Sequence, residues 1–253
     1  MPEPMPTPAP AAPDVRIDRQ GAVAILTIDR PQAANAFGPA AVAQFRAHLA
    51  AIRQDQAIAG LVVTGSGTRH FCSGGDVKAY AGYTEAAELD PVFDDARAVL
   101  DELDMMDVPT VAAINGVAIG GGVELALACD FRIARRDVTL SLPQVRMGIM
   151  PGWYAAERLL AICGRANAKR IMLSGRRFTG EEALALGAVD ELTDSDATVA
   201  AVAFLAQFEG ATRRSVGGVK RVIRELADNG RDAGRRLERD IFAGLWFHPD
   251  RKR

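Results

Sequence analysis

The chain has 253 residues, enough to bury one large hydrophobic core. Apolar residues make up 49% of it and charged residues 25%, the proportions of an ordinary globular protein. The formal net charge of −2 gives no overall attraction to nucleic acid or to an anionic membrane, and no apolar run is long enough to span a bilayer. We therefore expect neither nucleic acid nor a membrane as a partner.

Cysteine and histidine are too few and too scattered for a metal site or a disulfide framework. The three cysteines, Cys72, Cys129 and Cys163, form no CxxC pair, and the three histidines do not cluster. This pattern indicates no metal site and a reducing, cytoplasmic compartment.

The first thirteen residues alternate proline with small residues and contain neither a basic n-region nor an apolar h-region. Because proline removes backbone donors and favours extended conformers, residues 1–13 are expected to form a disordered tail rather than a signal peptide.

Strands and helices alternate through the next part of the chain. Apolar, β-branched runs predict strands, and apolar residues at helical spacing predict helices. This alternation is typical of an α/β protein with a largely parallel sheet. The predicted strands are Val23–Ile28, 61–64, Thr110–Ile114 and 131–134, the predicted helices are 39–53, 93–106 and one beginning near Val123, and residues 65–75 are expected to be a loop.

The last third of the chain is predominantly helical in pattern. In the final segment Ala233, Leu237, Ile241 and Leu245 recur every four residues, with aromatic residues at the end. This spacing predicts an amphipathic helix that packs on its own core or on a neighbouring subunit. The other predicted helices are 154–163, 165–173, 180–186, 197–208 and 216–227.

Two glycine-rich loops are the most informative segments. The first spans residues 71–77 and has the sequence FCSGGDV, and the second spans residues 116–125 and has the sequence GVAIGGGVEL. Glycine lets backbone N–H groups approach a ligand without a Cβ in the way. The second loop also opens a helix, whose free N–H groups and dipole favour negative charge. Both loops are therefore candidates for binding an anion or a developing oxyanion.

Other glycine-dependent sites do not fit. A GxGxxG dinucleotide motif that uses Gly120 and Gly122 requires a third glycine at position 125, where the chain has Leu125, and the expected later acidic residue is absent. No GxxxxGK[ST] phosphate loop and no GxSxG nucleophile elbow occur. Close packing of a helix on a strand would explain one such loop, but two loops, each beside an acidic residue, favour a site.

Seven short fragments follow one another along the chain: 30–36 (RPQAANA), 71–76 (FCSGGD), 120–125 (GGGVEL), 128–134 (ACDFRIA), 147–152 (MGIMPG), 173–176 (LSGR) and 186–189 (LGAV). Together they resemble the crotonase (enoyl-CoA hydratase/isomerase) superfamily. The resemblance implies a fold that is a spiral of ββα units with a helical C-terminal region, and a place in fatty acid metabolism. It implies an α/β core over residues 14–190, a helical trimerisation region over 191–253, and a homotrimer or dimer of trimers.

The resemblance also implies residue roles. The N–H groups of Gly75 and Gly121 correspond to the oxyanion hole that holds the thioester carbonyl, and Glu124 to a catalytic acid. Acyl-CoA is the implied substrate, with no cofactor beyond its CoA moiety. The implied substrate-binding residues are Ala34, Ser73, Gly74, Gly75, Asp76, Val77, Gly120, Gly121, Pro143 and Gln144.

Gln144 is the main departure from the family pattern. A second glutamate usually follows Glu124 after twenty residues, and the chain has glutamine there. A hydratase of the familiar type uses both carboxylates to hold and deprotonate water, and an amide does not exchange a proton at neutral pH. The substitution therefore favours isomerisation or decarboxylation. A purely structural alternative for Glu124 is an acidic residue that interacts with the dipole of its helix.

Some features resemble the acyl-CoA decarboxylases of the superfamily. Residues 147–153, MGIMPGW, are similar to their Met-Gly-Ile-Ile-Pro-Ser-Trp segment, and Glu238-Arg239 precedes Leu245-Trp246 as in those enzymes. Two alternatives stay open: an ordinary enoyl-CoA hydratase, which is a lyase, and a non-catalytic CoA-binding or scaffold homologue. A nucleic-acid-binding role is remote, because no aromatic–basic motif occurs.

Overall fold

The computed structural model describes residues 12–249 and residue 251, so nearly all of the predicted tail at 1–13 lies outside the described residues. The described chain opens with an antiparallel pair, β1 (Val15–Gln20) and β2 (Val23–Ile28). β2 confirms the predicted strand. β1 was not predicted from the sequence because only its first residue is buried, which leaves no alternation to detect.

Six strands form the larger sheet in the order β1-β2-β3-β5-β7-β10. From β2 onward every neighbouring pair is parallel, which confirms the predicted pairing. The strands that complete this sheet are β3 (Gly60–Gly65), β5 (Thr110–Ile114), β7 (Phe131–Arg135) and β10 (Glu191–Thr193).

A second sheet has the order β4-β6-β8-β9 and consists of three-residue strands. It corrects the prediction of a loop at 65–75, because β4 (His70–Cys72) lies inside that range and pairs with β6 (Val117–Ile119). Three residues are too few to show a strand period. The pairing matters for the site, since β4 and β6 lead directly into the two glycine-rich loops. The other two strands are β8 (Thr139–Ser141) and β9 (Arg177–Thr179).

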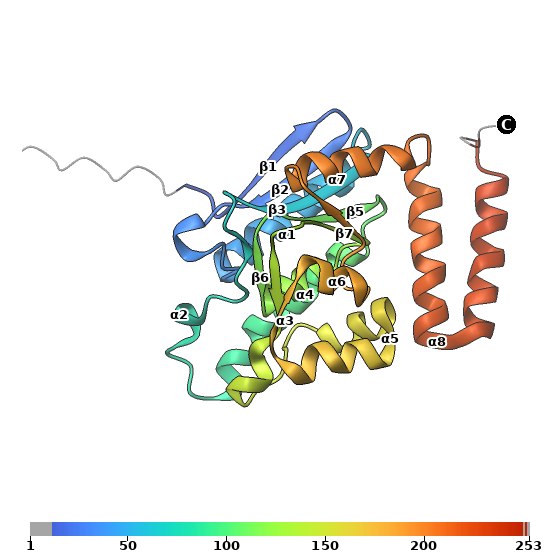
Figure 1. Ribbon diagram of the computed structural model, residues 1–253. Coiled ribbons are helices and arrows are strands. Elements are labelled where there is room, and N and C mark those ends of the chain that lie inside the picture. Colours follow the sequence, from blue (N-terminus) through green and yellow to red (C-terminus); the bar gives the residue numbers. More distant parts are fainter. Residues whose placement is uncertain (1–11, 250, 252–253) are drawn as a thin grey trace, which may run out of the picture.

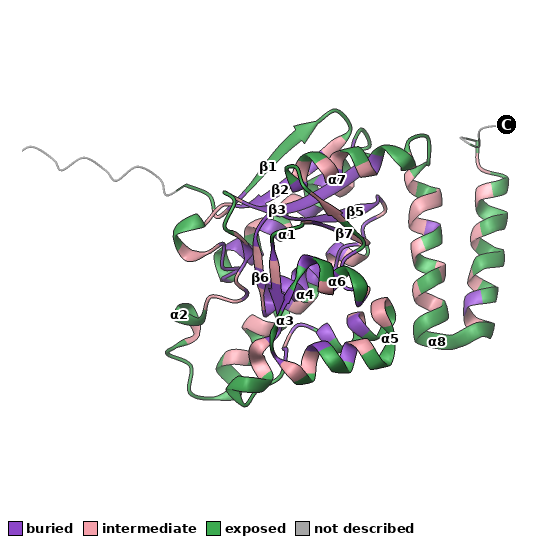
Figure 2. Cartoon of the chain, viewed as in Figure 1, coloured by how far each residue is buried: buried purple, intermediate pink, exposed green. Residues whose placement is uncertain are grey.

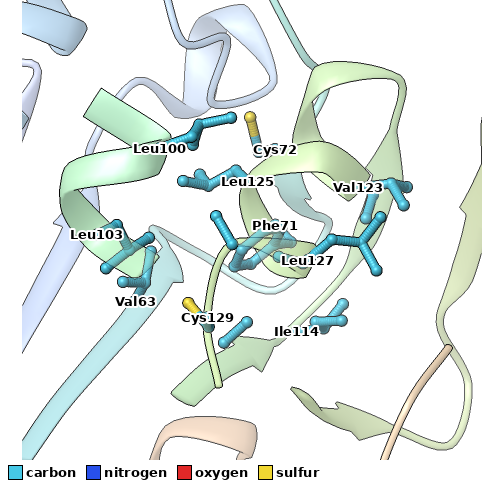
Figure 3. Packing of buried hydrophobic residues seen from close by; sticks show 14 of the residues in the cluster. Val63, Phe71, Cys72, Leu100, Leu103, Ile114, Val123, Leu125, Leu127 and Cys129 are labelled. Atoms are coloured by element: carbon cyan, nitrogen blue, oxygen red, sulfur yellow. The ribbon is translucent and has the colours of Figure 1, made fainter. Parts of the chain in front are cut away.

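Helices α1 (Pro39–Gln54), α3 (Ala86–Asp104) and α4 (Gly121–Leu127) enclose the main core. Every residue of α4 is buried. Figure 3 shows Leu125 of this helix between Leu100 of α3 and Phe71 of β4. The helix predicted at 93–106 begins earlier, at Ala86, because Glu85 and Glu88 form a capping box at its N-terminus.

The chain then forms α5 (Ala155–Ser174), α6 (Gly180–Ala185) and α7 (Ala197–Leu205). Gly164, with φ +73°, interrupts α5 at the boundary between the two helices predicted at 154–163 and 165–173. α7 packs on β3, β5 and β7 and closes a second, smaller core around Val62, Val111 and Ile133. The large sheet is thus covered on both faces.

The last helix, α8 (Arg213–Trp246), breaks at Gly230, where φ is +78°. It forms two arms that stand beside the body of the molecule (Figure 1) and expose most of their surface (Figure 2). Ion pairs Lys220–Asp130 and Arg213–Asp107 connect the first arm to the body. The molecule therefore has the α/β fold with a helical C-terminal region that the sequence predicts. Among the described residues, no helix combines the length and apolar character needed to cross a membrane.

Candidate active site

The two glycine-rich loops lie against each other. A Cβ on Gly74 would stand 2.9 Å from the backbone nitrogen of Gly121, and a Cβ on Gly122 would overlap the carbonyl oxygen of Cys72. Side chains at these positions would push the loops apart. The glycines are thus required for the close approach itself, apart from any role in binding.

The N–H groups of Gly75 and Gly121 donate no hydrogen bond within the described part of the chain, and both residues line the same cavity. Gly121 is the first residue of α4, and Gly120 before it adopts φ +54°. The dipole of α4 therefore adds to the attraction for negative charge at this point. Two unpaired donors on residues that line one cavity form an arrangement that can stabilise an oxyanion.

The cavity has a volume of about 620 Å³. It brings together nine of the eleven residues that the sequence analysis assigned to the site: Ser73, Gly74, Gly75, Val77, Gly120, Gly121, Glu124, Pro143 and Gln144.

Ala34 and Asp76 are not part of the cavity wall. The carbonyl of Ala34 accepts a hydrogen bond from the Ser73 N–H at 3.1 Å, so Ala34 supports the first loop from behind. Asp76 pairs with Arg30 at 2.9 Å and caps the short helix α2 (Val77–Tyr80). Direct contact of either residue with substrate stays a prediction.

Glu124 points its carboxyl group into the cavity wall and is only 2% exposed. Its Oε1 accepts hydrogen bonds from the backbone N–H groups of Trp153 at 2.7 Å and Ala155 at 3.2 Å. Tyr154 between them adopts a left-handed φ of +70°, so the donors on either side converge on one oxygen. Burial raises the pKa of Glu124, although these hydrogen bonds oppose the shift. The carboxyl group is therefore fixed in place, and it holds a proton more tightly than an exposed glutamate does.

Gln144 lies in the short helix η2 (Pro143–Met147), and its Nε2 stands 3.2 Å from the position of a Cβ on Gly120. Its buried Oε1 has no hydrogen-bond partner among the described residues.

Glu85 is the other carboxylate in the cavity wall, besides Glu124. Its exposed side chain accepts from the N3 backbone N–H of α3, so it is occupied as a cap.

Sequence reasoning missed an aromatic wall made by Tyr80, Tyr83, Phe93 and Trp153. The Phe93 ring centroid lies 5.7 Å from that of Tyr80 and 6.3 Å from that of Trp153. The Trp153 ring lies directly over the two loops, since a Cβ on Gly121 would overlap it. Tyr80, Tyr83 and Phe93 share no regular spacing, and Trp153 lies sixty residues after Phe93. Only Trp153, next to the recognised segment 147–152, therefore carried a signal.

No group of three or more His, Cys, Asp or Glu side chains suited to a metal ion occurs within residues 12–249 and 251. Cys72 and Cys129 are fully buried, and burial raises the pKa of each thiol to about 12. Neither thiol is activated as a nucleophile.

The family model described as enoyl-CoA hydratase/isomerase matches residues 18–253. The 2,3-dehydroadipyl-CoA hydratase of Escherichia coli is 33% identical over 237 residues, 93% of this chain and 91% of that protein. The short-chain-enoyl-CoA hydratase of Clostridium acetobutylicum is 30% identical over 186 residues, 72% of this chain and 69% of that protein. The crystal structure of an enoyl-CoA hydratase from Bacillus anthracis superposes with a TM-score of 0.88 at 27% identity, covering 94% of this chain and 92% of that one.

The chain belongs to the enoyl-CoA hydratase/isomerase family, with the crotonase fold. This confirms the resemblance drawn from the glycine-rich loops and makes acyl-CoA thioesters the class of substrate that fits the family.

Proposed function

We propose that the protein converts an acyl-CoA thioester through an enolate held by the Gly75 and Gly121 N–H groups. Chemistry at the α carbon of a thioester places negative charge on the carbonyl oxygen. Two donors that are already aimed into a cavity lower such a barrier by roughly 3–4 kcal/mol each. The observation that carries the proposal is that Gly75 and Gly121, whose N–H groups are unpaired among the described residues, line the same cavity as Glu124.

Glu124 is proposed as the group that moves the proton. Its raised pKa brings a carboxyl group nearer to the value at which it both accepts and returns a proton. In isomerisation of a 3-enoyl thioester, the carboxylate removes an α proton, the electron pair passes into a dienolate, and the same carboxyl group returns a proton to the γ carbon. The double bond moves, and no water is consumed.

Decarboxylation is the second reaction that this set of groups supports. In a malonyl-type thioester the bond between the α carbon and the carboxylate breaks, its electron pair forms the enolate, and CO₂ leaves. Protonated Glu124 then supplies one proton to the α carbon, and solvent reprotonates the carboxylate. Neither reaction needs a base that activates water.

Gln144 is the reason to favour these reactions over hydration. Gln144 and Glu124 both line the cavity, but glutamine does not remove a proton from water at neutral pH. The names of the related hydratases favour a second candidate, addition of water to an enoyl-CoA. In that case Glu124 would have to activate the water with Gln144 serving only to orient it.

A panel of 2-enoyl-, 3-enoyl-, 3-hydroxyacyl- and malonyl-type CoA thioesters, with products identified by mass spectrometry, tests the proposal. We expect turnover of a 3-enoyl or a malonyl-type thioester and little hydration of a 2-enoyl thioester. Efficient hydration alone would select the second candidate. If CoA thioesters bind but none turns over, the protein is a non-catalytic CoA-binding homologue.

We also propose that no cofactor beyond the CoA moiety takes part, because backbone N–H groups supply the electrophilic assistance.

Assembly as a trimer or a dimer of trimers is proposed from the exposed apolar residues of α8, on which Ile223 is 62% and Phe242 60% exposed. A cytoplasmic location is supported by the three cysteines, all of which are free.

A further inference from the structure

Tyr80 stands beside Gly75, which carries one of the two unpaired N–H groups. A Cβ on Gly75 would lie 2.8 Å from Cε2 of Tyr80 and 3.2 Å from its hydroxyl oxygen. Because that Cβ would be bonded to the Cα of Gly75, the phenol lies against the residue that carries the unpaired N–H. Tyr80 also lines the cavity that contains Glu124. A side-chain hydroxyl thus accompanies a backbone donor in the cavity wall.

The local sequence turns Tyr80 back toward Gly75. Helix α2 is a single turn, in which the Tyr80 N–H donates to the Asp76 carbonyl at 3.3 Å. The Asp76 side chain caps this turn and is itself held by Arg30 at 2.9 Å. Asp76, which does not line the cavity, therefore positions a residue that does.

Aromatic neighbours fix the ring from two directions. The Tyr80 ring centroid lies 5.7 Å from that of Phe93, in a tilted arrangement, and 6.3 Å from that of Tyr83, in a stacked one. Such contacts hold a ring without using its hydroxyl group. Within the described chain, no acceptor takes the proton of the Tyr80 hydroxyl.

The hydroxyl is protonated under physiological conditions. Burial raises the pKa of Tyr80, although a hydrogen bond with the Asp76 backbone opposes the shift. A neutral phenol is a hydrogen-bond donor, and its hydrogen bond strengthens as charge develops on the acceptor.

We infer that Tyr80 is a third donor to the thioester oxygen, so that a side-chain O–H joins the Gly75 and Gly121 N–H groups around the enolate. This inference rests on the proposed function and names a catalytic residue for it. No proton is transferred: the O–H stays on Tyr80, and the hydrogen bond shortens as the enolate forms. Three donors beside a single buried carboxyl group make a site suited to enolate formation rather than to water activation.

Acetoacetyl-CoA is a suitable probe, because its α proton is acidic and its enolate absorbs in the near ultraviolet. The pKa of the bound ligand reports enolate stabilisation without turnover. Wild-type protein and Tyr80→Phe are each titrated with this probe and, separately, with CoA. Tyr154→Phe is the matched control, since it removes a hydroxyl from a side chain outside the cavity wall and keeps the backbone.

We expect wild type to favour the bound enolate and Tyr80→Phe to reduce the enolate-to-keto ratio about tenfold, with CoA affinity unchanged. Tyr154→Phe should match wild type. Equal enolate stabilisation by wild type and Tyr80→Phe would overturn the inference and leave the proposed function standing. Failure of wild type to favour the enolate at all would contradict the proposed function, and the inference with it.

Discussion

Oε1 of Glu124 accepts a hydrogen bond from the Trp153 backbone nitrogen at 2.7 Å, across 29 positions of the chain. The same residue, Trp153, lays its ring over the glycine loop that begins α4. One short segment therefore fixes the orientation of the buried carboxyl group and covers the donor next to it. This relationship makes Glu124 the first residue to test.

Replacing Glu124 with glutamine should lower kcat about 10²–10⁴-fold, because a positioned acid–base group is lost. The amide oxygen can still accept from the Trp153 and Ala155 N–H groups, so the geometry should be kept. CoA affinity, measured by calorimetry, is the control and should change less than twofold. Full activity of Glu124→Gln on the true substrate would rule out the proton-moving role.

Glu124→Gln should raise the stability of the fold although it lowers the activity. Burial raises the pKa of Glu124 in the folded state, so folding favours the protonated carboxyl group. Its contribution to stability is present below the unfolded pKa and is lost as pH rises through the folded pKa. At neutral pH, urea titration should therefore find Glu124→Gln more stable than wild type, with the difference shrinking in acid. A difference independent of pH would show that burial of the charge is not its cause.

Gln144→Glu should add hydratase activity. A carboxylate at this position would give the cavity a second group able to accept a proton from water, and we expect hydration of crotonyl-CoA to rise at least about tenfold. The rate is followed by loss of the conjugated enoyl absorbance. Gln144→Asn, which stays an amide, is the control and should gain nothing. Equal rates for wild type and Gln144→Glu would mean that residue 144 does not decide the reaction.

Gly122→Ala should destabilise the protein by about 1–3 kcal/mol, because the new Cβ would overlap the Cys72 carbonyl and force the two loops apart. Gly82→Ala is the matched control, since a Cβ there meets nothing within 4 Å. Thermal unfolding of both variants measures the difference. If the two variants unfold at the same temperature, close loop packing is not what requires glycine at 122.

The exposed apolar residues of α8 should hold subunits together. The ring centroids of Phe242 and Trp246 lie 5.4 Å apart in a tilted arrangement, and the two residues are 60% and 47% exposed, an apolar surface that an isolated molecule would leave in water. Sedimentation equilibrium at micromolar concentration should find a trimer or hexamer, and Phe242→Asp should shift it toward monomer. A monomeric wild type would contradict the proposed assembly.

The α/β character and the two glycine loops could be predicted from the sequence because their signals are local. Strands such as β2 and β5 consist almost entirely of apolar residues, and the glycines around Gly75 and Gly121 form a family-specific pattern. The break within α5 coincides with Gly164, a boundary that the sequence also indicated.

The second sheet and the aromatic wall could not be predicted in this way. Strands β4, β6, β8 and β9 have three residues each, so they are stabilised by neighbours in space rather than by their own pattern. Tyr80 lies on α2, which was not among the predicted helices, and Phe93 lies on α3, which begins at Ala86 instead of residue 93. Side chains drawn from distant segments leave no periodic trace.

The central claim is that Glu124 exchanges a proton with an enolate on the Gly75 and Gly121 N–H groups while no water adds to the substrate. Incubation of a 3-enoyl-CoA with the enzyme in D₂O, followed by mass spectrometry, tests it most directly. We expect a 2-enoyl-CoA product that carries deuterium at exchanged carbon positions and contains no added oxygen. In Glu124→Gln, both the shift of the double bond and the incorporation of deuterium should be lost. A product that has gained a molecule of water at a rate matching or exceeding deuterium incorporation would contradict it.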